Sequence, residues 1–396
     1  MSGMSRLFAA AGPGLPAHLD QFGESPTVTA ELIGEIETAG LSGRGGAGFP
    51  TGRKMAAVRG TAPLVVGNGA EGEPLSRKDT TLLTRAPHLV LDGLSAAAAA
   101  IGADTAYLYV NTAARQPVAD ALAERRAAGV DVHPVSVVVA PERFVAGEES
   151  AALRRIEGGP ALPRDRTVVS AVSGIGGRPT LVNNVETLAH IALIARFGSA
   201  WFRSVGDAAE PGTMLVTLSG ALRQAIVEIP TGVALLDVLT EAAVGPHTLR
   251  AVLIGGYHGT WLPAKQFGAA RMARSGLESL GATPGAGVIH GLDRTECGLK
   301  RTAEITGYLA DQSARQCGPC LNGLPRLAAL LDELAFGHAT EDLVHRVHRM
   351  VGLVDGRGSC RHPDGTARLV RSALEAFSDD VALHRDGRCV VGESAD

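Results

Sequence analysis

Two cysteines spaced two residues apart are the side chains whose chemistry is easiest to name. They lie in the segment ARQCGPCLNG, at positions 317 and 320. Such a pair either forms a thioredoxin-like redox dithiol or supplies two thiolate ligands to a metal. A redox dithiol gains its reactivity where a strand gives way to a helix, because the helix N-terminus lowers the pKa of the attacking thiol. The elements around Cys317 and Cys320 therefore bear on the choice.

The sequence is helical on both sides of this pair. Apolar residues recur there at helical spacing, namely Ile305, Tyr308, Leu309, Leu324, Leu327, Leu331 and Leu334. Cys360 follows Cys320 by 40 residues, in the loop GRGSCRHPDG that precedes another helical run. Cysteines in loops at the ends of packed helices can converge on one point, as a metal or iron-sulfur centre requires and a dithiol does not. A zinc site, buried thiols and a dithiol switch remain alternatives.

A glycine-rich segment near the N-terminus is the second chemical feature. LSGRGGAGFPTGRKM, residues 41–55, places Gly43, Gly45 and Gly48 in the G-x-G-x-x-G spacing. The preceding segment ELIGEIETAG is typical of a helix rather than a strand, and no acidic residue follows about 20 positions on, so the dinucleotide-binding fingerprint is incomplete. Small residues still expose backbone N–H groups to a phosphate or a flat ring, and Lys54 adds a cation. The alternative is an ordinary glycine-rich surface turn.

Composition limits the class of protein. The chain has 396 residues, of which 45% are hydrophobic, enough for two or three domains with cores. A net charge of −4 and a pI near 6.3 argue against a nucleic-acid surface. Five cysteines fit a reducing compartment, no secretory signal is visible, and the most apolar stretch, LVLDGLSAAAAAIGA, is too short to span a membrane. We expect a cytoplasmic protein, able to dock on the cytoplasmic face of a membrane complex.

The elements that must position these residues fall into three sections. Up to about residue 205, strand-like segments at 64–68, 106–110 and 135–140 alternate with alanine-rich helices, which is typical of an α/β fold. Residues 213–262 read as the hairpin, helix and strand of a small α+β unit. After about residue 293 the pattern is helical almost to the end.

Three further segments resemble a known family, in the same order along the chain. NGAEGEP (68–74), FVAGEES (144–150) and GRPTLVNNVETLAHI (177–191) are similar to the flavin-site segments of the NADH-oxidising, FMN-bearing F subunit of respiratory complex I. They also resemble the FMN-carrying subunits of NAD-reducing hydrogenases and formate dehydrogenases. The resemblance implies a Rossmann-like α/β flavin domain at 1–208, a ubiquitin-like β-grasp (SLBB) domain at 209–292, and a helical bundle with a 4Fe-4S cluster at 293–396.

The resemblance also assigns roles to individual residues. Lys54 matches a lysine near the FMN phosphate, Phe49 matches an aromatic that stacks on the NADH adenine, and Arg166 stands where the family has a lysine. The cofactor-binding positions that it implies are Gly43, Arg44, Gly45, Gly46, Phe49, Lys54, Asn68, Glu71, Glu73, Gly147, Glu148, Glu149, Arg166, Asn183 and Asn184. Amide and carboxylate groups of this kind can orient FMN, while the flavin itself supplies the hydride chemistry.

The chain departs from the family at the flavin and nucleotide positions. Ala70 replaces an aspartate beside the flavin. Ala57 and Val169 replace two phenylalanines that enclose the adenine, which leaves Phe49 as the aromatic partner. Base stacking on an aromatic contributes roughly 1 to 3 kcal/mol, so these changes should weaken NADH binding unless Arg166 compensates.

The cluster motif also departs from the family. The family reads Ser-Cys-Gly-x-Cys-x-Pro-Cys with a distant fourth cysteine, and SARQCGPC aligns with it at Cys317 and Cys320, with Cys360 in the distant place and Ala314 at the first cysteine. A 4Fe-4S cluster ordinarily has four thiolates. The remaining ligand could be Cys389, His362 or a non-protein group. Cys297 is the poorer candidate, since a helix over 299–313 would hold it about 22 Å away.

Two functions of different class follow. In the first, NAD(P)H reduces FMN, and electrons pass through a 4Fe-4S cluster to a ferredoxin, another redox subunit or a membrane-bound redox complex. In the second, the chain is a non-catalytic relative that has lost its cofactors and serves as an assembly or binding subunit. Ala57, Ala70 and Ala314 support the second, whereas the intact GRGGAGFPTG, GEES and NNVETLA segments favour the first.

Overall fold

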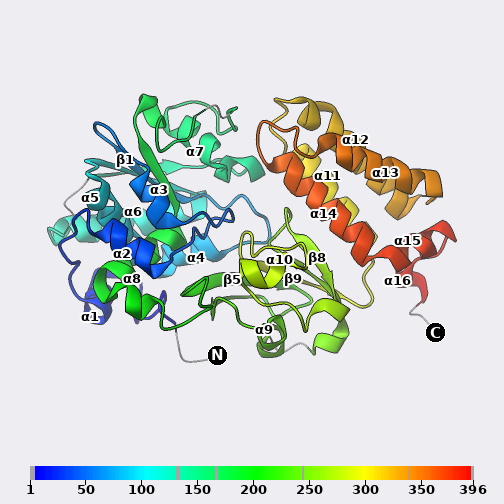
Figure 1. Cartoon of the computed structure of the whole chain (residues 1–396), viewed down its shortest axis with the longest axis horizontal. Coiled ribbons are helices and arrows are strands. Elements are labelled where there is room, and N and C mark those ends of the chain that lie inside the picture. Colours follow the sequence, from blue (N-terminus) through cyan, green and yellow to red (C-terminus); the bar gives the residue numbers. More distant parts are fainter. Residues whose placement is uncertain (1–4, 131–133, 166–167, 243–244, 338, 394–396) are drawn as a thin grey trace. The chain divides into compact units, whose positions relative to one another are not determined.

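The computed structural model describes residues 5–130, 134–165, 168–242, 245–337 and 339–393. These residues form two compact units (Figure 1). The first comprises the chain up to Gly72, with Ser76–Val216 and Ile226–Val233. The second comprises Glu73–Leu75, Thr217–Ala225 and the chain from Ala234 onward.

The first unit is built on a four-stranded parallel sheet in the order β3-β2-β1-β4. Its strands are β1 (Leu64–Gly69), β2 (Thr105–Val110), β3 (Val135–Val139) and β4 (Thr180–Asn184). Its helices are α1 (Leu15–Phe22), α2 (Leu32–Ala39), α3 (Thr51–Ala56), α4 (Lys78–Arg85), α5 (Pro87–Ile101), α6 (Thr112–Ala127), α7 (Glu149–Ile156) and α8 (Val185–Phe202). The predicted alternation of strands and helices in this section is confirmed.

Alternating strand residues divide the core of this unit between the two faces of the sheet. Val65 of β1 joins the large cluster that also contains the buried residues of α5 and α8, whereas Val66 joins a smaller cluster with residues of α7. Such period-two alternation follows from the pleat. Gly93 lets α5 approach α8 closely, because a Cβ at that position would lie 1.8 Å from the carbonyl oxygen of Leu188.

The second unit combines a sheet with a helical bundle. A five-stranded sheet has the order β6-β5-β9-β7-β8, and its strands are β5 (Thr213–Gly220), β6 (Ala225–Pro230), β7 (Leu249–Ile254), β8 (Thr260–Pro263) and β9 (Val288–Asp293). The boundary between the units falls within β5, and β6 belongs to the first unit from Ile226 onward. The short helices α9 (Leu235–Glu241) and α10 (Arg274–Glu278) accompany this sheet. β5 runs parallel to β9, while β7 is antiparallel to both of its neighbours.

The C-terminal section is helical, as predicted. Its helices are α11 (Gly298–Asp311), α12 (Leu324–Phe336), α13 (Glu341–Val354), α14 (His362–Ala376), α15 (Ser378–Arg385) and α16 (Val390–Glu393). α11 packs against α12 and α14, and α13 packs against α12 and α14 (Figure 1). The predicted fold class, α/β with a helical C-terminal region, is confirmed, while the β-grasp assignment and the boundaries at 208 and 292 stay predictions. In the described parts of the chain, no helix is long and apolar enough to cross a membrane.

A buried carboxylate ties four helices of the first unit together, namely α1, α5, α6 and α8. Asp92 of α5 accepts hydrogen bonds from His18 Nε2 at 2.7 Å and from Arg125 Nη1 at 2.8 Å, and it also pairs with Arg196 of α8. Burial would raise the pKa of Asp92, but His18 and the two guanidinium groups hold that pKa well below its usual range. The carboxylate is therefore charged in the folded protein.

Replacing this carboxylate by its neutral isostere should destabilise the first unit. Asp92→Asn leaves two buried guanidinium groups without their counter-charge, which costs about 3 to 5 kcal/mol of unfolding free energy. Urea denaturation followed by far-UV circular dichroism measures the change. Asp104→Asn, at an exposed position, is the control and should shift stability by less than about 0.5 kcal/mol. Equal stability of the two variants would contradict a structural role for Asp92.

Candidate functional site

The order of the strands places a ligand site between β1 and β4. The chain moves outward from β1 through β2 to β3, and then returns to add β4 on the opposite side of β1. In open parallel sheets, ligands bind outside the carboxyl ends of the strands at such a switch point. Asn68 and Asn184 are partners in the β1–β4 register at these carboxyl ends. Both were predicted from sequence to bind the cofactor.

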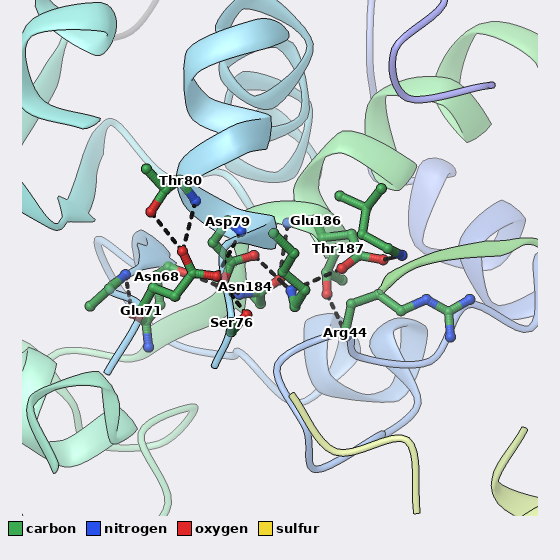
Figure 2. Close-up of polar contacts among 12 residues, drawn as sticks. Arg44, Asn68, Glu71, Ser76, Asp79, Thr80, Asn184, Glu186 and Thr187 are labelled. Atoms are coloured by element: carbon green, nitrogen blue, oxygen red, sulfur yellow. Dashed lines mark hydrogen bonds and ion pairs between the residues drawn. The ribbon is translucent and has the colours of Figure 1, made fainter. Parts of the chain in front are cut away.

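The side chain of Asn184 connects the two strand ends to the helices that follow them. Its Nδ2 donates to Asp79 Oδ2 at 2.7 Å and to the carbonyl oxygen of Asn68 at 3.2 Å. Its Oδ1 caps α8 by accepting from the backbone N–H of Glu186 at 3.0 Å. Figure 2 shows these polar groups gathered at one place, with Glu71, Asp79 and Glu186 around Asn184. Asn184 is thus held in one orientation, directly before the first residue of α8.

A buried lysine that sequence reasoning missed lies at the centre of this network. Lys78 Nζ contacts Asp79 Oδ1 at 2.7 Å, Glu186 Oε2 at 2.9 Å and Asn184 Oδ1 at 3.2 Å. Burial would lower the pKa of Lys78, but the two carboxylates outweigh burial and raise it. Burial raises the pKa of Asp79, and the surplus negative charge of Glu71 and Glu186 adds to that shift. Lys78 therefore stays charged, while the carboxylates share a single ammonium group.

Glu71 fixes the loop between β1 and α4. Its carboxylate accepts from Ser76 Oγ at 2.6 Å, from the backbone N–H of Asp79 at 3.1 Å, and from both the backbone N–H (3.2 Å) and the hydroxyl (2.6 Å) of Thr80. These are the first N–H groups of α4, which lack partners inside the helix. In the structure Glu71 thus acts as a helix cap from outside the helix.

The glycine-rich segment forms a closed loop between α2 and α3. The helix predicted before this segment is confirmed as α2. The loop is closed by a hydrogen bond from the N–H of Gly43 to the carbonyl of Phe49 at 2.9 Å. Arg44 N–H donates to Thr187 Oγ1 at 2.9 Å, which holds the loop against the start of α8. A Cβ on Gly45 would lie 3.2 Å from Asn184 Cβ, which is tighter than an ordinary contact, and Gly46 has a φ of 103°, a backbone conformation that favours glycine.

Lys54 and Glu149 form an ion pair beside β4. Lys54 Nζ lies 2.9 Å from Glu149 Oε2 and 2.6 Å from the carbonyl oxygen of Val182. The other oxygen of Glu149 accepts from Ser170 Oγ at 2.5 Å. A lysine ammonium has three donors, and these two contacts use two of them. Glu149 also lines a cavity of about 210 Å³, together with Arg164, Asp165 and Val168.

Two buried polar atoms near Lys54 and Asn184 have no hydrogen-bond partner among the residues that the structure describes. They are Asn183 Nδ2, on β4, and Thr51 Oγ1, at the start of α3. Buried donors are almost always satisfied in native proteins, and an exception commonly marks a bound ligand or water. Asn183 adjoins both Asn184, which contacts the glycine loop, and Val182, whose carbonyl binds Lys54. The switch point therefore fits a ligand that carries hydrogen-bond acceptors, as a phosphorylated flavin does.

The remaining predicted positions differ in their placement. Asn68 Nδ2 donates to the carbonyl oxygen of Gly147 at 2.9 Å, so these two join the switch point. Glu148 caps α7 by accepting from the N–H groups of Ser150 and Ala151. Glu73 belongs to the second unit, where it accepts from the N–H of Tyr257 at 2.8 Å. Phe49 is 55% exposed, and Arg166 lies outside the described residues.

The three predicted cluster cysteines converge in the second unit. Burial raises the pKa of the Cys320 thiol, and the neighbouring thiols of Cys317 and Cys360 raise it further. Hydrogen bonds from Ser359 and Cys320 to the Cys317 sulfur outweigh burial and lower the pKa of Cys317. The loop before α12 and the loop before α14 therefore meet, as a shared metal centre requires.

The structure places two of the suggested fourth ligands, Cys389 and His362, in other contacts. The Cys389 thiol lies within 4.8 Å of Cys297 and His384, at the opposite end of α11 from Cys317. His362 has both ring nitrogens engaged, with Nε2 2.8 Å from the carbonyl oxygen of Leu309 and Nδ1 3.1 Å from His258 Nε2. The helix between the two groups of cysteines is the physical reason that Cys389 cannot reach the first group.

The segment that replaces the family's first cysteine lies beside Cys320. The backbone N–H of Arg315 donates to the Cys320 sulfur, which places Ala314 next to the three thiols along the chain. Arg315 has a φ of 53°, in the left-handed region that favours glycine. The hydroxyl of Ser313 is buried and has no partner within the described part of the chain. Arg315 therefore has a backbone conformation that favours glycine, at the position where the family motif has one.

Comparisons with known proteins identify the family and match the two regions that contain these residues. The family model described as the Nuo51 FMN-binding domain matches residues 36–193, and that of the NADH-ubiquinone oxidoreductase-F iron-sulfur binding region matches residues 300–384. F subunit 2 of the NADH-quinone oxidoreductase of Rhizobium meliloti is 33% identical over 399 residues, which cover 96% of this chain and 94% of the relative. The chain belongs to the family of NADH-quinone oxidoreductase F subunits. The predicted family is therefore confirmed.

Another member of this family and a solved structure extend the comparison. The NADH-quinone oxidoreductase F subunit of Mycobacterium bovis is 31% identical over 380 residues, covering 90% of this chain and 85% of the relative. The crystal structure of an NAD⁺-reducing NiFe hydrogenase in the H2-reduced state matches with a TM-score of 0.82 at 32% identity. That match covers 89% of this chain, and the chain spans 62% of the hydrogenase chain.

Proposed function

We propose that this member of the family is an electron-transfer flavoprotein, in which NADH is the donor, FMN the acceptor of the hydride, and a 4Fe-4S cluster the route to a redox partner. The observation that carries the proposal is the close approach of the glycine loop to Asn184 at the β1–β4 switch point, next to the buried and unpaired Nδ2 of Asn183 in the same strand. The meeting of Cys317, Cys320 and Cys360 in one place supports the second half of the route.

The residues at the switch point suit FMN in distinct ways. The glycine loop lets backbone N–H groups approach a phosphate, and the α8 N-terminus beside Asn184 adds a partial positive charge. Asn183 Nδ2 offers a buried donor, and Lys54 offers a cation that Glu149 holds in position. When bound, the flavin would accept a hydride and release single electrons. The chain's contribution is to orient the ring and its phosphate through these fixed groups.

The nucleotide half of the site is the more open part. Phe49 stands at the edge of the glycine loop, where its exposed ring is free of the core and can stack on an adenine. Ala57 and Val169 are exposed as well. Arg166 is assigned to a phosphate of the dinucleotide by its match to a family lysine. NADH would therefore bind with less stacking surface than two further phenylalanines provide.

The cluster would be held by three thiolates. Cys317 and Cys320 come from the turn before α12, and Cys360 from the loop before α14. Hydrogen bonds from Ser359 stabilise the charged form of Cys317, which is the form that ligates iron. The fourth iron position is assigned to a non-protein ligand, because Cys389 and His362 are engaged elsewhere.

The domain plan and the partners complete the proposal. We assign domains at 1–208, 209–292 and 293–396, with an SLBB-type β-grasp in the middle. The strand order is β6-β5-β9-β7-β8, and β5 and β9, which are the first and last of these strands along the chain, pair in parallel. This arrangement supports that assignment. The partners are other redox subunits or a ferredoxin, and the place of action is the cytoplasm, including the cytoplasmic face of a membrane-bound redox complex.

One experiment tests the proposal against the alternative of a relative without cofactors. The full chain is purified anaerobically, its absorption spectrum is recorded, and flavin, iron and acid-labile sulfide are assayed. We expect FMN and an iron-sulfur absorption band that bleaches on reduction. Protein that remains free of flavin and iron after anaerobic reconstitution would overturn the electron-transfer function and support an assembly or binding subunit.

Asn183→Ala should release flavin without unfolding the protein. The Nδ2 donor has no protein partner within the described residues, so its loss costs the fold little but removes a hydrogen bond to the ligand. We expect FMN affinity to fall roughly 10- to 100-fold, measured by fluorescence titration of the apoprotein. The melting temperature of the apoprotein serves as the control. Unchanged flavin affinity would show that this amide does not face the cofactor.

Ala57→Phe should tighten NADH binding. The new ring would restore one stacking surface, worth roughly 1 to 3 kcal/mol, and titration of flavin reduction by NADH under anaerobic conditions measures it. Ala57→Leu is the matched control, because it adds apolar volume without a stacking face. Should the leucine variant gain as much as the phenylalanine variant, or the wild type already saturate at micromolar NADH, the assigned adenine site would be wrong.

Ala314→Cys should restore a fourth thiolate to the cluster. The Arg315 N–H contact to Cys320 holds this position beside the other ligands, so the added thiol can displace an exchangeable ligand. We expect iron and sulfide contents to survive exposure to air for longer than in the wild type. Ala328→Cys, on α12, is the control for an added thiol nearby. If both variants lose their iron at the wild-type rate, position 314 does not reach the cluster.

A further inference from the structure

Three metal-binding side chains that no part of the proposed electron route uses meet at the start of α11. The ligand atoms of Cys297, His384 and Cys389 all lie within 4.8 Å of one another. Cys297 is the residue before α11, His384 is on α15, and Cys389 lies between α15 and α16. Three separate positions in the sequence thus bring two thiols and an imidazole to one point.

The imidazole of His384 is oriented as a metal ligand. Its Nδ1 lies 3.1 Å from the carbonyl oxygen of Leu334. A carbonyl only accepts, so Nδ1 carries the hydrogen and Nε2 keeps its lone pair. Nε2 faces the Cys297 sulfur at 3.5 Å. A histidine whose other ring nitrogen donates to a backbone carbonyl is the usual arrangement in protein metal sites, because that bond fixes the tautomer and the ring plane.

The distance between Cys297 Sγ and His384 Nε2 matches what a single tetrahedral ion requires. With Zn–S of about 2.3 Å and Zn–N of about 2.05 Å, a tetrahedral angle places sulfur and nitrogen about 3.5 Å apart. The observed separation of Cys297 Sγ and His384 Nε2 is 3.5 Å. The pair therefore needs almost no movement to share one ion.

Asp380 lies beside Cys297 but outside this group of ligand atoms. Its buried carboxylate has Oδ2 4.0 Å from Cys297 Sγ and 3.3 Å from the backbone nitrogen of Gly298, while its other oxygen pairs with Arg250. Among the described residues, the ligand atoms that lie within 4.8 Å of one another are those of Cys297, His384 and Cys389. Arg250 keeps the carboxylate in place and offsets its charge.

We propose that Cys297, His384 and Cys389 bind a structural zinc ion. Mixed sulfur and nitrogen donors in a tetrahedral set are typical of zinc. Cys297 and His384 are nearly buried, whereas Cys389 is half-buried, which leaves a path for the ion. The ion would tie the C-terminal segment to the start of α11 and contribute to the folding of the bundle, as structural metals do.

The test uses the full chain, purified anaerobically with its iron and without chelators. Zinc and iron are counted by elemental mass spectrometry. We expect one zinc ion per chain in addition to the iron. Cys297→Ser, Cys389→Ser and His384→Ala should each lose the zinc and keep the iron and the flavin. Cys317→Ser should lose the iron and keep the zinc. His345→Ala, at an exposed histidine of α13, should keep both metals.

Several outcomes would overturn the proposal. One is wild-type protein that holds iron but no zinc after incubation with Zn²⁺ and removal of the excess. Another is a disulfide between Cys297 and Cys389, detected as two missing thiols in a denaturing titration of the anaerobic protein. Should the ligand variants fail to fold, Co²⁺ exchange into the wild type tests the site instead, because a tetrahedral thiolate site gives intense visible bands. Absence of these Co²⁺ bands would also overturn the proposal. Zinc results of either kind leave the flavin and iron assays of the electron-transfer function unaffected.

Discussion

The buried ammonium group of Lys78 is the interaction on which the flavin side of the molecule depends. It contacts Asp79 at the start of α4, Asn184 at the end of β4 and Glu186 in the first turn of α8. Two parallel strands can end side by side without fixing the segments that follow them. A charge that is buried must be paired, since an unpaired one is expensive. Lys78 therefore couples the loop after β1 to the helix after β4.

The rest of the switch point follows from that coupling. Once Asn184 is held by Asp79 and Lys78, its Cβ forms the surface against which Gly45 packs, and Thr187 one turn on receives the N–H of Arg44. The glycine loop thus takes its position from α8, not from the strand that a dinucleotide fingerprint would have used. In the proposed function, a loop flanked by two helices thereby takes the phosphate role that is usually given to a strand–loop–helix turn.

The sequence allowed the glycine loop, the asparagine pair and the three cysteines to be found, because each belongs to a short contiguous motif with a physical use. It did not reveal Lys78, since an isolated lysine beside an aspartate reads as an exposed charge, and its partner Glu186 lies 108 residues later. Likewise, the GEES segment did not reveal that Glu148 caps α7. Motifs identify local chemistry, whereas burial and long-range pairing emerge only when the chain is folded.

The two groups of cysteines are separated by a rigid element, and that separation has chemical consequences. α11 has 14 residues and is therefore about 21 Å long, with Cys297 before its first residue and Cys317 beyond its last. Thiols at one end cannot replace ligands lost at the other. The absence of a cysteine at position 314 thus cannot be compensated by Cys297 or Cys389, which is why the proposed cluster is assigned a non-protein fourth ligand. The spare thiols are free to serve a different ion, and the imidazole of His384 beside them selects for one that accepts nitrogen as well as sulfur.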